Sequence, residues 1–518
     1  MSVGEILRRN ALNFPDKTAL VFEDRRIAYG ELNTTVNRVA YHLLRKGLQK
    51  GDRLATLLHN GVEFIELYFA CAKSGLVLVP LNNLLKAREL VPILAYIKPR
   101  ALVFDHDFVE LTKEMLPKLP FIQFPICLEE DPAGFQPYNA FREGESDQEP
   151  DVVLSDDDLV SIFLTSGTTG RPKGVMRTHR HDWINMISCA LEMGVRHDDL
   201  ALLLFPFYHV TFVDNMRHLL MANTVAILRE GKFDPHHVLR ILSREAITMC
   251  QMVPTMINAL LQVEDLEAYD LSRFRLLIYA ASPMPVELLK KAMKRLNCRF
   301  VQMYGQTETG PATTALQPED HLLEGSEDQM ARLASAGRAI LDYEIRIVDE
   351  EGRDVPMGEV GEIAVRSEAM TKGYWDLPEE TARTIRDGWL YTGDFGRMDA
   401  DRYVFIVDRK NDMIISGGKN IYPREVEEVI YKHDAVLETA VIGVPDEYWG
   451  ESVKALVVLK PGKEANEEEI IALCKDNLAS YKKPKSVEFR SRLPKSPTGK
   501  VLKRTIREGY WKGMKRNV

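Results

Sequence analysis

Residues 53–81 read RLATLLHNGVEFIELYFACAKSGLVLVPL. Two short apolar runs, residues 53–58 and 76–81, flank residues 62–73, where apolar side chains recur with the helical period. A strand, a helix and a second strand in this order are typical of a βαβ unit. The alternation continues to about Gly310. We therefore predict an α/β fold whose large domain stacks such units around mostly parallel sheets.

The pattern changes after Leu341. Strand-like runs at residues 343–348, 361–365 and 403–407 are separated by turn signals, which predicts a small antiparallel subdomain. Beyond about Asp412, two helical segments and two strand-like runs suffice for a small α+β domain. The 518 residues exceed the roughly 250 to 300 at which single cores stop growing. We predict a large domain, residues 1–410, and a small mobile C-terminal domain, residues 411–518.

Composition excludes several classes of protein. The net charge of −9 disfavours nucleic acid as a partner, because binding to a phosphate backbone needs a basic face. The six cysteines are scattered singly, without zinc or disulfide spacing, which favours the reducing cytoplasm. No apolar run approaches the roughly 20 residues of a membrane span. The most hydrophobic stretch, residues 200–213, is predicted as a buried strand.

A loop rich in hydroxyl groups and glycine follows the apolar run at residues 159–164. It reads Thr165-Ser166-Gly167-Thr168-Thr169-Gly170-Arg171-Pro172-Lys173-Gly174. Glycines let consecutive backbone N–H groups face one anion, the hydroxyls add neutral donors, and Lys173 adds a positive charge. The Walker A pattern is absent. The loop therefore predicts a site for the triphosphate of ATP.

This loop resembles the phosphate loop of the adenylate-forming superfamily, which includes acyl-CoA synthetases, firefly luciferase and the adenylation domains of peptide synthetases. Further motifs follow in the family's order over nearly the whole chain. They are Tyr304-Gly305-Gln306-Thr307-Glu308, Trp389-Leu390-Tyr391-Thr392-Gly393-Asp394, Asp408-Arg409-Lys410-Asn411-Asp412 and Pro494-Lys495-Ser496-Pro497-Thr498-Gly499-Lys500. The closest resemblance is to the acyl- and aryl-CoA ligases.

The resemblance implies roles for the residues of the large domain. Tyr304 and Gly305 would lie against adenine, with Ala281 and Ser282 forming the wall between the adenine and acyl pockets. The Thr307 hydroxyl would reach the α-phosphate, and Glu308 with Thr165 would hold Mg²⁺. Asp394 would bind the ribose hydroxyls, and Arg409 would contact ribose or phosphate.

Two further residues are implied in catalysis. Lys500 matches the lysine that bridges the substrate carboxylate and the nucleotide during adenylation. His209, in Phe205-Pro206-Phe207-Tyr208-His209-Val210, matches a segment beside the acyl carboxylate. A buried core histidine is the structural alternative for His209.

The resemblance also gives the small domain a role with coenzyme A. Gly417 and Gly418 match the loop that lines the pantetheine tunnel, although a glycine hairpin explains them equally well. Trp449, Lys483 and Lys485 match positions around the CoA nucleotide, although a lysine run is usually a solvated face. The domain hinge falls on Asn411, where many relatives carry Asp or Lys.

The implied reaction is the ATP-dependent ligation of a carboxylic acid to CoA through an acyl-adenylate. Transfer to a carrier protein and a non-catalytic acyl-nucleotide-binding module are the alternatives. The candidate acyl pocket is mostly apolar, which favours a fatty, alicyclic or aromatic acid; its residues are Trp183, Val210, Phe212, Met252, Ala281 and Met303. Asp214 and Arg217 read as an ion pair, and a dicarboxylic acid would fit if Arg217 faced the pocket. A homodimer is left open.

Overall fold

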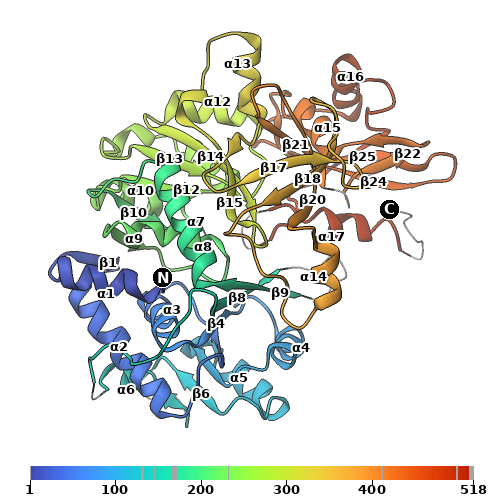
Figure 1. Cartoon of the computed structure of the whole chain (residues 1–518). Helices are drawn as coiled ribbons and strands as arrows, with labels where there is room; N and C mark the ends of the chain where they lie inside the picture. Colours follow the sequence, from blue (N-terminus) through green and yellow to red (C-terminus); the bar gives the residue numbers. More distant parts are fainter. Residues whose placement is uncertain are drawn as a thin grey trace.

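The computed structural model describes residues 2–129, 134–144, 146–165, 172–231, 233–409, 412–496 and 500–512. Figure 1 shows a large body, coloured blue to orange, and a smaller red body beside it. We call residues up to 409 the large domain and residues from 412 the small domain. The predicted α/β class, with parallel sheets first and antiparallel sheets later in the chain, is confirmed.

A seven-stranded sheet contains the βαβ unit predicted from residues 53–81. Strands β3 and β4 pair in parallel, and α3 connects them. Only the edge strand β9 runs antiparallel to its neighbour, β8. In spatial order the strands are β7 (Gln136–Pro137), β6 (Phe124–Cys127), β5 (Ala101–Phe104), β3 (Arg53–Leu57), β4 (Val77–Pro80), β8 (Leu159–Thr165) and β9 (Lys173–Thr178).

A nine-stranded sheet forms the second layer of the large domain. Its central strands are parallel, and antiparallel strands close both edges. In spatial order they are β16 (Arg338–Ala339), β15 (Gly310–Leu316), β14 (Arg299–Gln306), β13 (Leu276–Tyr279), β12 (Met249–Met252), β10 (Leu200–Leu203), β11 (Thr224–Ile227), β1 (Thr18–Phe22) and β2 (Arg25–Ala28).

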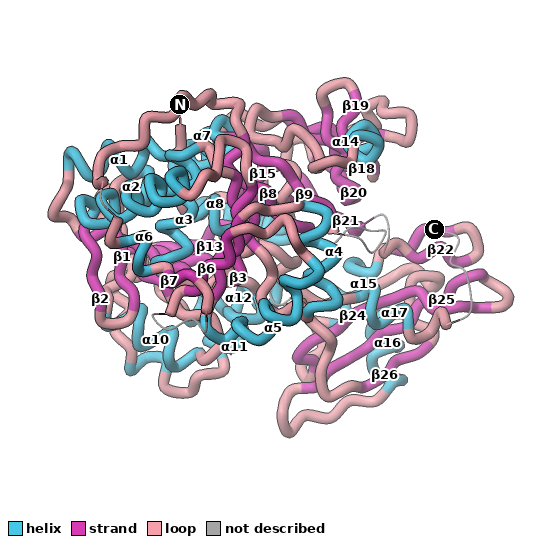
Figure 2. Tube along the Cα trace, turned by 90° about the horizontal axis from the view of Figure 1, so that it is seen from below, coloured by secondary structure: helices cyan, strands magenta, loops and turns pink. Residues whose placement is uncertain are grey.

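Helices surround these two sheets, as Figure 2 shows from below. Their apolar faces meet the sheets in continuous cores, because the strands are apolar on both sides. The helices are α1 (Gly4–Asn13), α2 (Tyr29–Arg45), α3 (Val62–Ser74), α4 (Ala87–Ile97), α5 (Val109–Met115), α6 (Asn139–Arg142), α7 (His179–Glu192), α8 (Thr211–Asn215), α9 (Arg217–Leu220), α10 (Pro235–Arg244), α11 (Pro254–Leu261), α12 (Val286–Arg295) and α13 (Glu327–Ala331).

The strand predicted over residues 200–213 is wrong for most of its length. Strand β10 ends at Leu203, and helix α8 begins at Thr211. The chain leaves the sheet after Leu203, and Pro206, which has no N–H group to donate to a neighbouring strand, cannot resume it. This departure places His209 in the connection that follows the carboxyl end of β10, where ligand sites in α/β folds lie.

The subdomain sheet is antiparallel, as predicted, and the sheet of the small domain, which was predicted only as α+β, is mainly antiparallel. The subdomain sheet contains β17 (Glu344–Val348), β18 (Gly361–Arg366), β20 (Trp389–Met398), β19 (Ile385–Arg386) and β21 (Val404–Arg409), with α14 (Pro378–Thr384) beside it. The small-domain sheet contains β23 (Lys419–Ile421), β22 (Ile414–Ser416), β25 (Gly450–Leu459), β24 (Val436–Asp446) and β26 (Ser486–Phe489), with α15 (Pro423–Ile430), α16 (Glu467–Asn477) and α17 (Lys503–Glu508).

The chain passes from one sheet to the other between β21 and β22. The small domain has a hydrophobic core of its own around Val426, Val441 and Ile470. Lys410 and Asn411 lie outside the described residues. The division at 410/411 and the hinge at Asn411 therefore stay predictions.

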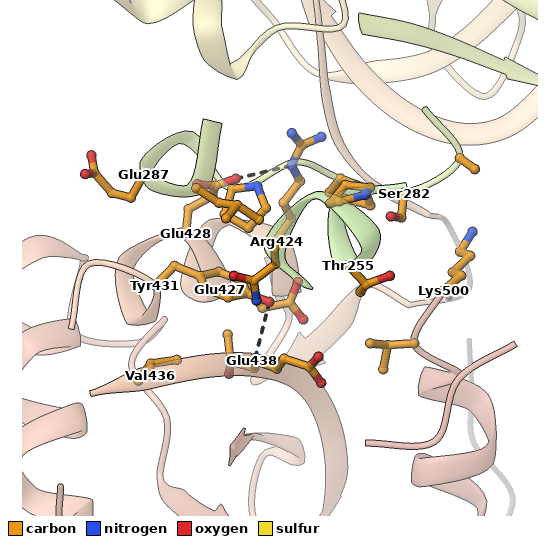
Figure 3. A pocket seen from close by; sticks show the side chains of 18 of the residues that line it. Thr255, Ser282, Glu287, Arg424, Glu427, Glu428, Tyr431, Val436, Glu438 and Lys500 are labelled. Atoms are coloured by element: carbon orange, nitrogen blue, oxygen red, sulfur yellow. Dashed lines mark hydrogen bonds and ion pairs between the residues drawn. The ribbon is translucent and has the colours of Figure 1, made fainter. Parts of the chain in front are cut away.

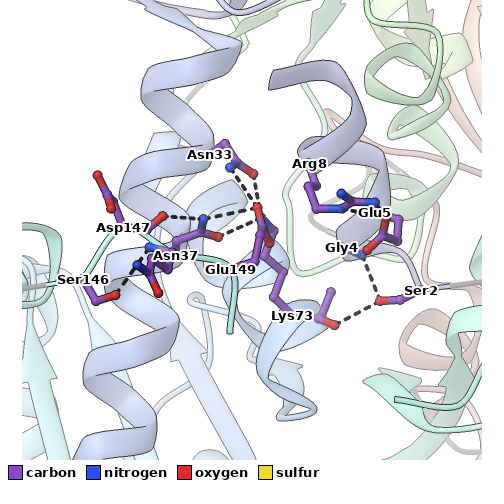
Figure 4. Close-up of polar contacts among 12 residues, drawn as sticks. Ser2, Gly4, Glu5, Arg8, Asn33, Asn37, Lys73, Ser146, Asp147 and Glu149 are labelled. Atoms are coloured by element: carbon purple, nitrogen blue, oxygen red, sulfur yellow. Dashed lines mark hydrogen bonds and ion pairs between the residues drawn. The ribbon is translucent and has the colours of Figure 1, made fainter. Parts of the chain in front are cut away.

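A buried lysine joins the first helices of the large domain (Figure 4). The Lys73 ammonium on α3 donates to Asn33 Oδ1 at 2.6 Å and Asn37 Oδ1 at 2.8 Å on α2. It also lies 2.7 Å from Glu149 Oε2 in the segment that leads into β8. The Lys73 side chain is 4% exposed and the Glu149 side chain 37%. The cluster thus ties this segment to two helices.

We expect Glu149→Gln to destabilise the large domain by about 1 to 3 kcal/mol, because it removes the counter-charge of a buried ammonium group. Urea unfolding followed by circular dichroism measures the loss. Glu110→Gln is the control, since Glu110 pairs with Lys113 at the surface and its side chain is 84% exposed. Equal stability of the two variants would contradict a structural role for the Lys73 cluster.

Among the helices of the described ranges, none combines the length and the apolar character needed to cross a membrane.

Candidate active site

A cleft of about 770 Å³ lies between the large and the small domain. Its walls come from the loop after β13, the end of β14, strands β20 and β21, and the small domain from α15 onward. Figure 3 shows its lining, with Lys500 and Ser282 near one end. Seven predicted site residues line it: Ala281, Ser282, Tyr304, Gly305, Asp394, Arg409 and Lys500.

Asp394 on β20 receives contacts from three side chains. Its Oδ2 accepts hydrogen bonds from the Tyr304 hydroxyl at 2.8 Å and from Gln306 Nε2 at 2.7 Å. Arg409 Nε lies 3.4 Å from Oδ1, because Arg409 faces Asp394 across strands β20 and β21. These contacts fix the Asp394 carboxylate group at the cleft wall, where its remaining lone pairs can accept hydrogen bonds from hydroxyl groups.

Thr165 and Glu308 meet at the ends of two different sheets. Thr165 Oγ1 lies 3.5 Å from Glu308 Oε1, which also accepts a hydrogen bond from the Tyr374 hydroxyl at 3.1 Å. Burial raises the pKa of the Glu308 carboxyl, so a cation beside it would be favoured. A carboxylate and a hydroxyl are oxygen ligands of the kind Mg²⁺ takes together with phosphates. The residues therefore fit the predicted metal.

Lys173 lies at the C-terminal end of the predicted phosphate loop, where β9 begins. Strands β8 and β9 pair so that Thr165 and Lys173 lie opposite each other. Lys173 Nζ is 2.7 Å from Glu380 Oε2 on α14 and 4.8 Å from the centre of the Tyr374 ring. The predicted loop residues Ser166, Gly167, Thr168, Thr169 and Gly170 lie outside the described residues.

The backbone around Ala281 and Gly305 approaches the cleft closely. Ala281 has φ +69°, a left-handed conformation that costs a residue with a Cβ atom free energy and often marks functional sites. A Cβ atom on Gly305 would lie 2.5 Å from the carbonyl oxygen of Pro311, so the strand end has no room for a side chain. Ser282 lies beside Ala281, and Thr307 lies in the turn that follows β14.

Lys500 reaches the cleft from the small domain just before α17. Burial, with the nearby guanidinium of Arg409, lowers the pKa of the Lys500 ammonium to about 7. Burial, with the charge of Lys500, lowers the pKa of His209 to about 4. His209 Nδ1 lies 2.6 Å from Thr211 Oγ1, which orients the ring. The neutral His209 ring of the large domain therefore lies close enough to Lys500 of the small domain for the charge of Lys500 to affect its pKa.

Comparison with known proteins explains this arrangement. A model of the AMP-binding enzyme family matches residues 7–375, and one of the AMP-binding enzyme C-terminal domain matches residues 425–500. The chain belongs to the AMP-binding enzyme family. The resemblance to adenylate-forming enzymes, and the prediction that the chain is an enzyme of this class, are confirmed.

Two curated relatives match this AMP-binding enzyme over nearly its whole length. Feruloyl-CoA synthase of Amycolatopsis sp. is 36% identical over 502 residues, 97% of this chain and 98% of that protein. The fatty acid:acyl-carrier-protein ligase ScoC of Streptomyces coeruleorubidus is 34% identical over 513 residues, 98% of this chain and 96% of that protein.

Two solved structures share the fold of the AMP-binding enzyme. The anthranilate CoA ligase AuaEII in complex with anthranoyl-AMP superposes with a TM-score of 0.91 at 28% identity, covering 98% of this chain and 97% of that one. ATP-bound MatB from Rhodopseudomonas palustris gives 0.89 at 32% identity, covering 98% and 99%.

The residues predicted to bind CoA lie on the small domain of this AMP-binding enzyme, away from the lining of the cleft. Gly417 and Gly418, with φ +56° and +75°, form the two-residue turn between β22 and β23. A Cβ atom on Gly417 would collide with the Trp449 ring, which lies beside Lys485 Nζ at 5.7 Å. Figure 1 shows β22 at the outer edge of the small domain. Of these residues and the nearby Lys483, none lines the cleft that Lys500 enters.

The candidate acyl-pocket residues divide between the cleft and the cores of the enzyme. Ala281 and Met303 line the cleft. Phe212 instead packs edge-on against Phe64 and Tyr68, and Met252 lies in another buried cluster. Arg217 Nη1 is 2.9 Å from Asp214 Oδ1, both side chains being buried, which confirms the predicted ion pair.

Three residues at the site were missed by sequence reasoning. Gln306 stands inside the motif that begins at Tyr304, so its donor group could have been recognised there. Tyr374 and Glu380 contact Glu308 and Lys173 from a segment that carries no recognisable motif. Only the folded chain brings that segment to the phosphate loop.

Proposed function

We propose that this AMP-binding enzyme is an ATP-dependent carboxylate:CoA ligase. In the first step a carboxylate oxygen of the acid attacks the α-phosphorus of ATP, and pyrophosphate leaves. In the second step the CoA sulfur attacks the acyl carbon, AMP leaves, and the thiol proton passes to solvent. The observation that carries the proposal is one cleft into which the large domain presents Asp394 and Arg409 and the small domain presents Lys500.

The large domain would bind and orient ATP. Tyr304 would lie against adenine, and Asp394 would accept hydrogen bonds from the ribose hydroxyls, held ready by its contact with Arg409. Thr307, Lys173 and the loop between Thr165 and Lys173 would contact the phosphates. Glu308 and Thr165 would hold Mg²⁺, which supplies positive charge against the phosphate oxygens.

Lys500 and His209 would act on the reacting carboxylate. The ammonium of Lys500 would lie between the acid and the α-phosphate and stabilise the negative charge that builds there. The neutral His209 ring, oriented by Thr211, would position the carboxylate of the acid. Positioning and charge neutralisation of this kind carry most of the catalysis of phosphoryl transfer.

We propose that the small domain then rotates about Asn411 and exchanges Lys500 for the turn at Gly417 and Gly418. The two steps need different groups around one carbonyl carbon. In the present arrangement Lys500 lines the cleft while the glycine turn lies at the outer edge of the small domain. After rotation, Trp449, Lys483 and Lys485 would meet the CoA nucleotide.

The acid is proposed to be apolar. Ala281 and Met303 supply apolar surface at the cleft, and the buried Arg217 is already neutralised by Asp214, which argues against a dicarboxylic acid. A carrier protein as acceptor is the second candidate, because one relative with 34% identity is a fatty acid:acyl-carrier-protein ligase. We further propose a cytoplasmic location, since all six cysteines are free thiols. A homodimer stays a prediction.

Pyrophosphate exchange into ATP over a panel of fatty, alicyclic, aromatic and dicarboxylic acids tests the proposal. We expect exchange with an apolar monocarboxylic acid and, on addition of CoA, the matching thioester by mass spectrometry. Exchange with no acid would favour a non-catalytic binding module. Exchange without thioester from CoA would favour the carrier protein.

The pH dependence of adenylation should follow the loss of the proton from the Lys500 ammonium group. Because the pKa of Lys500 is lowered to about 7, its ammonium form is lost as pH rises through about 7 in the free enzyme. We expect kcat/KM for ATP in the exchange reaction to fall up to about tenfold per pH unit above pH 7, whereas kcat falls only at higher pH because bound phosphates favour the ammonium form.

Lys500→Arg is the matched control, since a guanidinium stays protonated over this range. It should exchange more slowly but lose the fall above pH 7. An identical alkaline limb in the variant would show that another group titrates.

A further inference from the structure

Residues 371–380 of the large domain contact both the end of the predicted phosphate loop and the predicted metal site. The backbone N–H of Trp375 donates a hydrogen bond to the carbonyl of Gly174, which follows Lys173 on β9, at 2.7 Å. The backbone N–H of Thr371 donates to the carbonyl of Glu308 at 2.8 Å. This segment therefore connects two parts of the site that belong to different sheets.

Tyr374, in the middle of this segment, contacts one charged group with each part of its side chain. Its hydroxyl donates to Glu308 Oε1 at 3.1 Å, and the centre of its ring lies 4.8 Å from Lys173 Nζ. The residue is only 6% exposed, and its backbone N–H donates to Thr381 Oγ1 at 2.9 Å. Both contacts gain strength where water is excluded.

Glu308 and Lys173 carry opposite charges, and a direct ion pair between them would occupy both groups. The carboxylate would then be less available to a metal ion, and the ammonium less available to phosphates. Within the part of the chain that the structure describes, Lys173 forms its ion pair with Glu380 at 2.7 Å and not with Glu308. The Tyr374 side chain, which is uncharged, binds each group without neutralising it.

We propose that Tyr374 is a positioning residue for the complex of Mg²⁺ and ATP. Its hydroxyl keeps the Glu308 carboxylate available to the metal, and its ring keeps the Lys173 ammonium available to the phosphates and apart from that carboxylate. The inference rests on the proposed ligase function, which assigns the metal to Glu308 and the phosphates to Lys173. Because the two roles belong to different parts of one side chain, substitution can separate them.

The test measures pyrophosphate exchange in Tyr374→Phe and Tyr374→Leu, with the acid that the wild type exchanges fastest. Tyr374→Phe keeps the ring and loses the hydroxyl. We expect the Mg²⁺ concentration for half-maximal exchange to rise about tenfold, with KM for ATP at saturating Mg²⁺ within about twofold of wild type. Tyr374→Leu loses both contacts, so KM for ATP should also rise, by about tenfold.

Tyr96→Phe is the matched control, because it removes a phenol hydroxyl that donates to the carbonyl of Trp375, next to Tyr374 in the chain. It should leave KM for ATP and the Mg²⁺ requirement unchanged. Since Phe fills nearly the same space as Tyr, Tyr374→Phe preserves the packing of the segment and tests the hydroxyl alone. An unchanged Mg²⁺ requirement in Tyr374→Phe, or an unchanged KM for ATP in Tyr374→Leu, would overturn the proposal.

Isothermal titration calorimetry of ATP binding, with and without Mg²⁺ and with no acid present, gives a readout that needs no activity. The factor by which Mg²⁺ strengthens ATP binding should be about tenfold smaller in Tyr374→Phe than in the wild type. Tyr374→Leu should weaken ATP binding even without Mg²⁺, by about fivefold. An equal gain from Mg²⁺ in the wild type and Tyr374→Phe would overturn the proposal. If these binding changes appeared but the wild type exchanged no acid, the ligase function alone would be contradicted.

Discussion

We expect Lys500→Ala to lower pyrophosphate exchange by about 1,000-fold and to leave thioester formation from a preformed acyl-adenylate near the wild-type rate. Lys500 lines the cleft from the small domain just before α17, where the charges of Arg409 and Asp394 act on its ammonium group. Loss of a preorganised charge from a reacting centre typically costs about 100- to 1,000-fold in rate. The second step is spared because a different face of the small domain would serve it.

Isotope exchange measures the first half-reaction, and thioester appearance from synthetic acyl-adenylate measures the second. Lys495→Ala is the control in the same loop, since Lys495 pairs with Glu438 on β24. It should retain most of the exchange activity. If Lys500→Ala slowed both half-reactions equally, a single domain arrangement would serve both steps.

Glu308→Gln is expected to lower the exchange rate by about 100-fold or more and to raise the Mg²⁺ concentration needed for half-maximal rate. Gln has the shape of Glu and can still accept from the Tyr374 hydroxyl, so the fold is preserved while the charge is lost. Exchange measured over a Mg²⁺ titration separates the loss of metal affinity from the loss of rate.

Glu380→Gln provides a comparison in the same region. It removes the carboxylate beside Lys173 but leaves Glu308 and Thr165 in place. We expect less than a tenfold change and an unaltered Mg²⁺ requirement. An unaltered Mg²⁺ requirement in Glu308→Gln would place the metal elsewhere.

Much of the cleft could be predicted from the sequence because its residues stand in short motifs at strand ends. Tyr304 lies near the carboxyl end of β14, and Asp394 and Arg409 are opposite each other on the adjacent strands β20 and β21. In each case the local pattern fixes the strand, and the strand fixes the direction of the side chain. Lys500 was predicted from its place in the last motif of the series, and its side chain lines the same cleft.

Other features depend on contacts that no local pattern encodes. Phe212 follows the His209 segment closely, yet its ring packs on Phe64 and Tyr68 of α3 and not at the cleft. Tyr374 and Glu380 reach the phosphate-loop region from a different part of the chain. The relative position of the two domains likewise depends on contacts between them, such as the hydrogen bond from Arg424 of α15 to the Ile406 carbonyl of β21, which periodicity and spacing do not describe.

Trp449 packs against the glycine turn, so its fluorescence depends on the surroundings of that turn. The indole is 45% exposed and sits on the element proposed to change places with Lys500. Its emission wavelength depends on how much water surrounds it, so a rotation that covers the ring would shift the fluorescence toward the blue. Because the chain has five tryptophans, the part of that shift that Trp449→Phe abolishes would report the domain movement, without any attached dye.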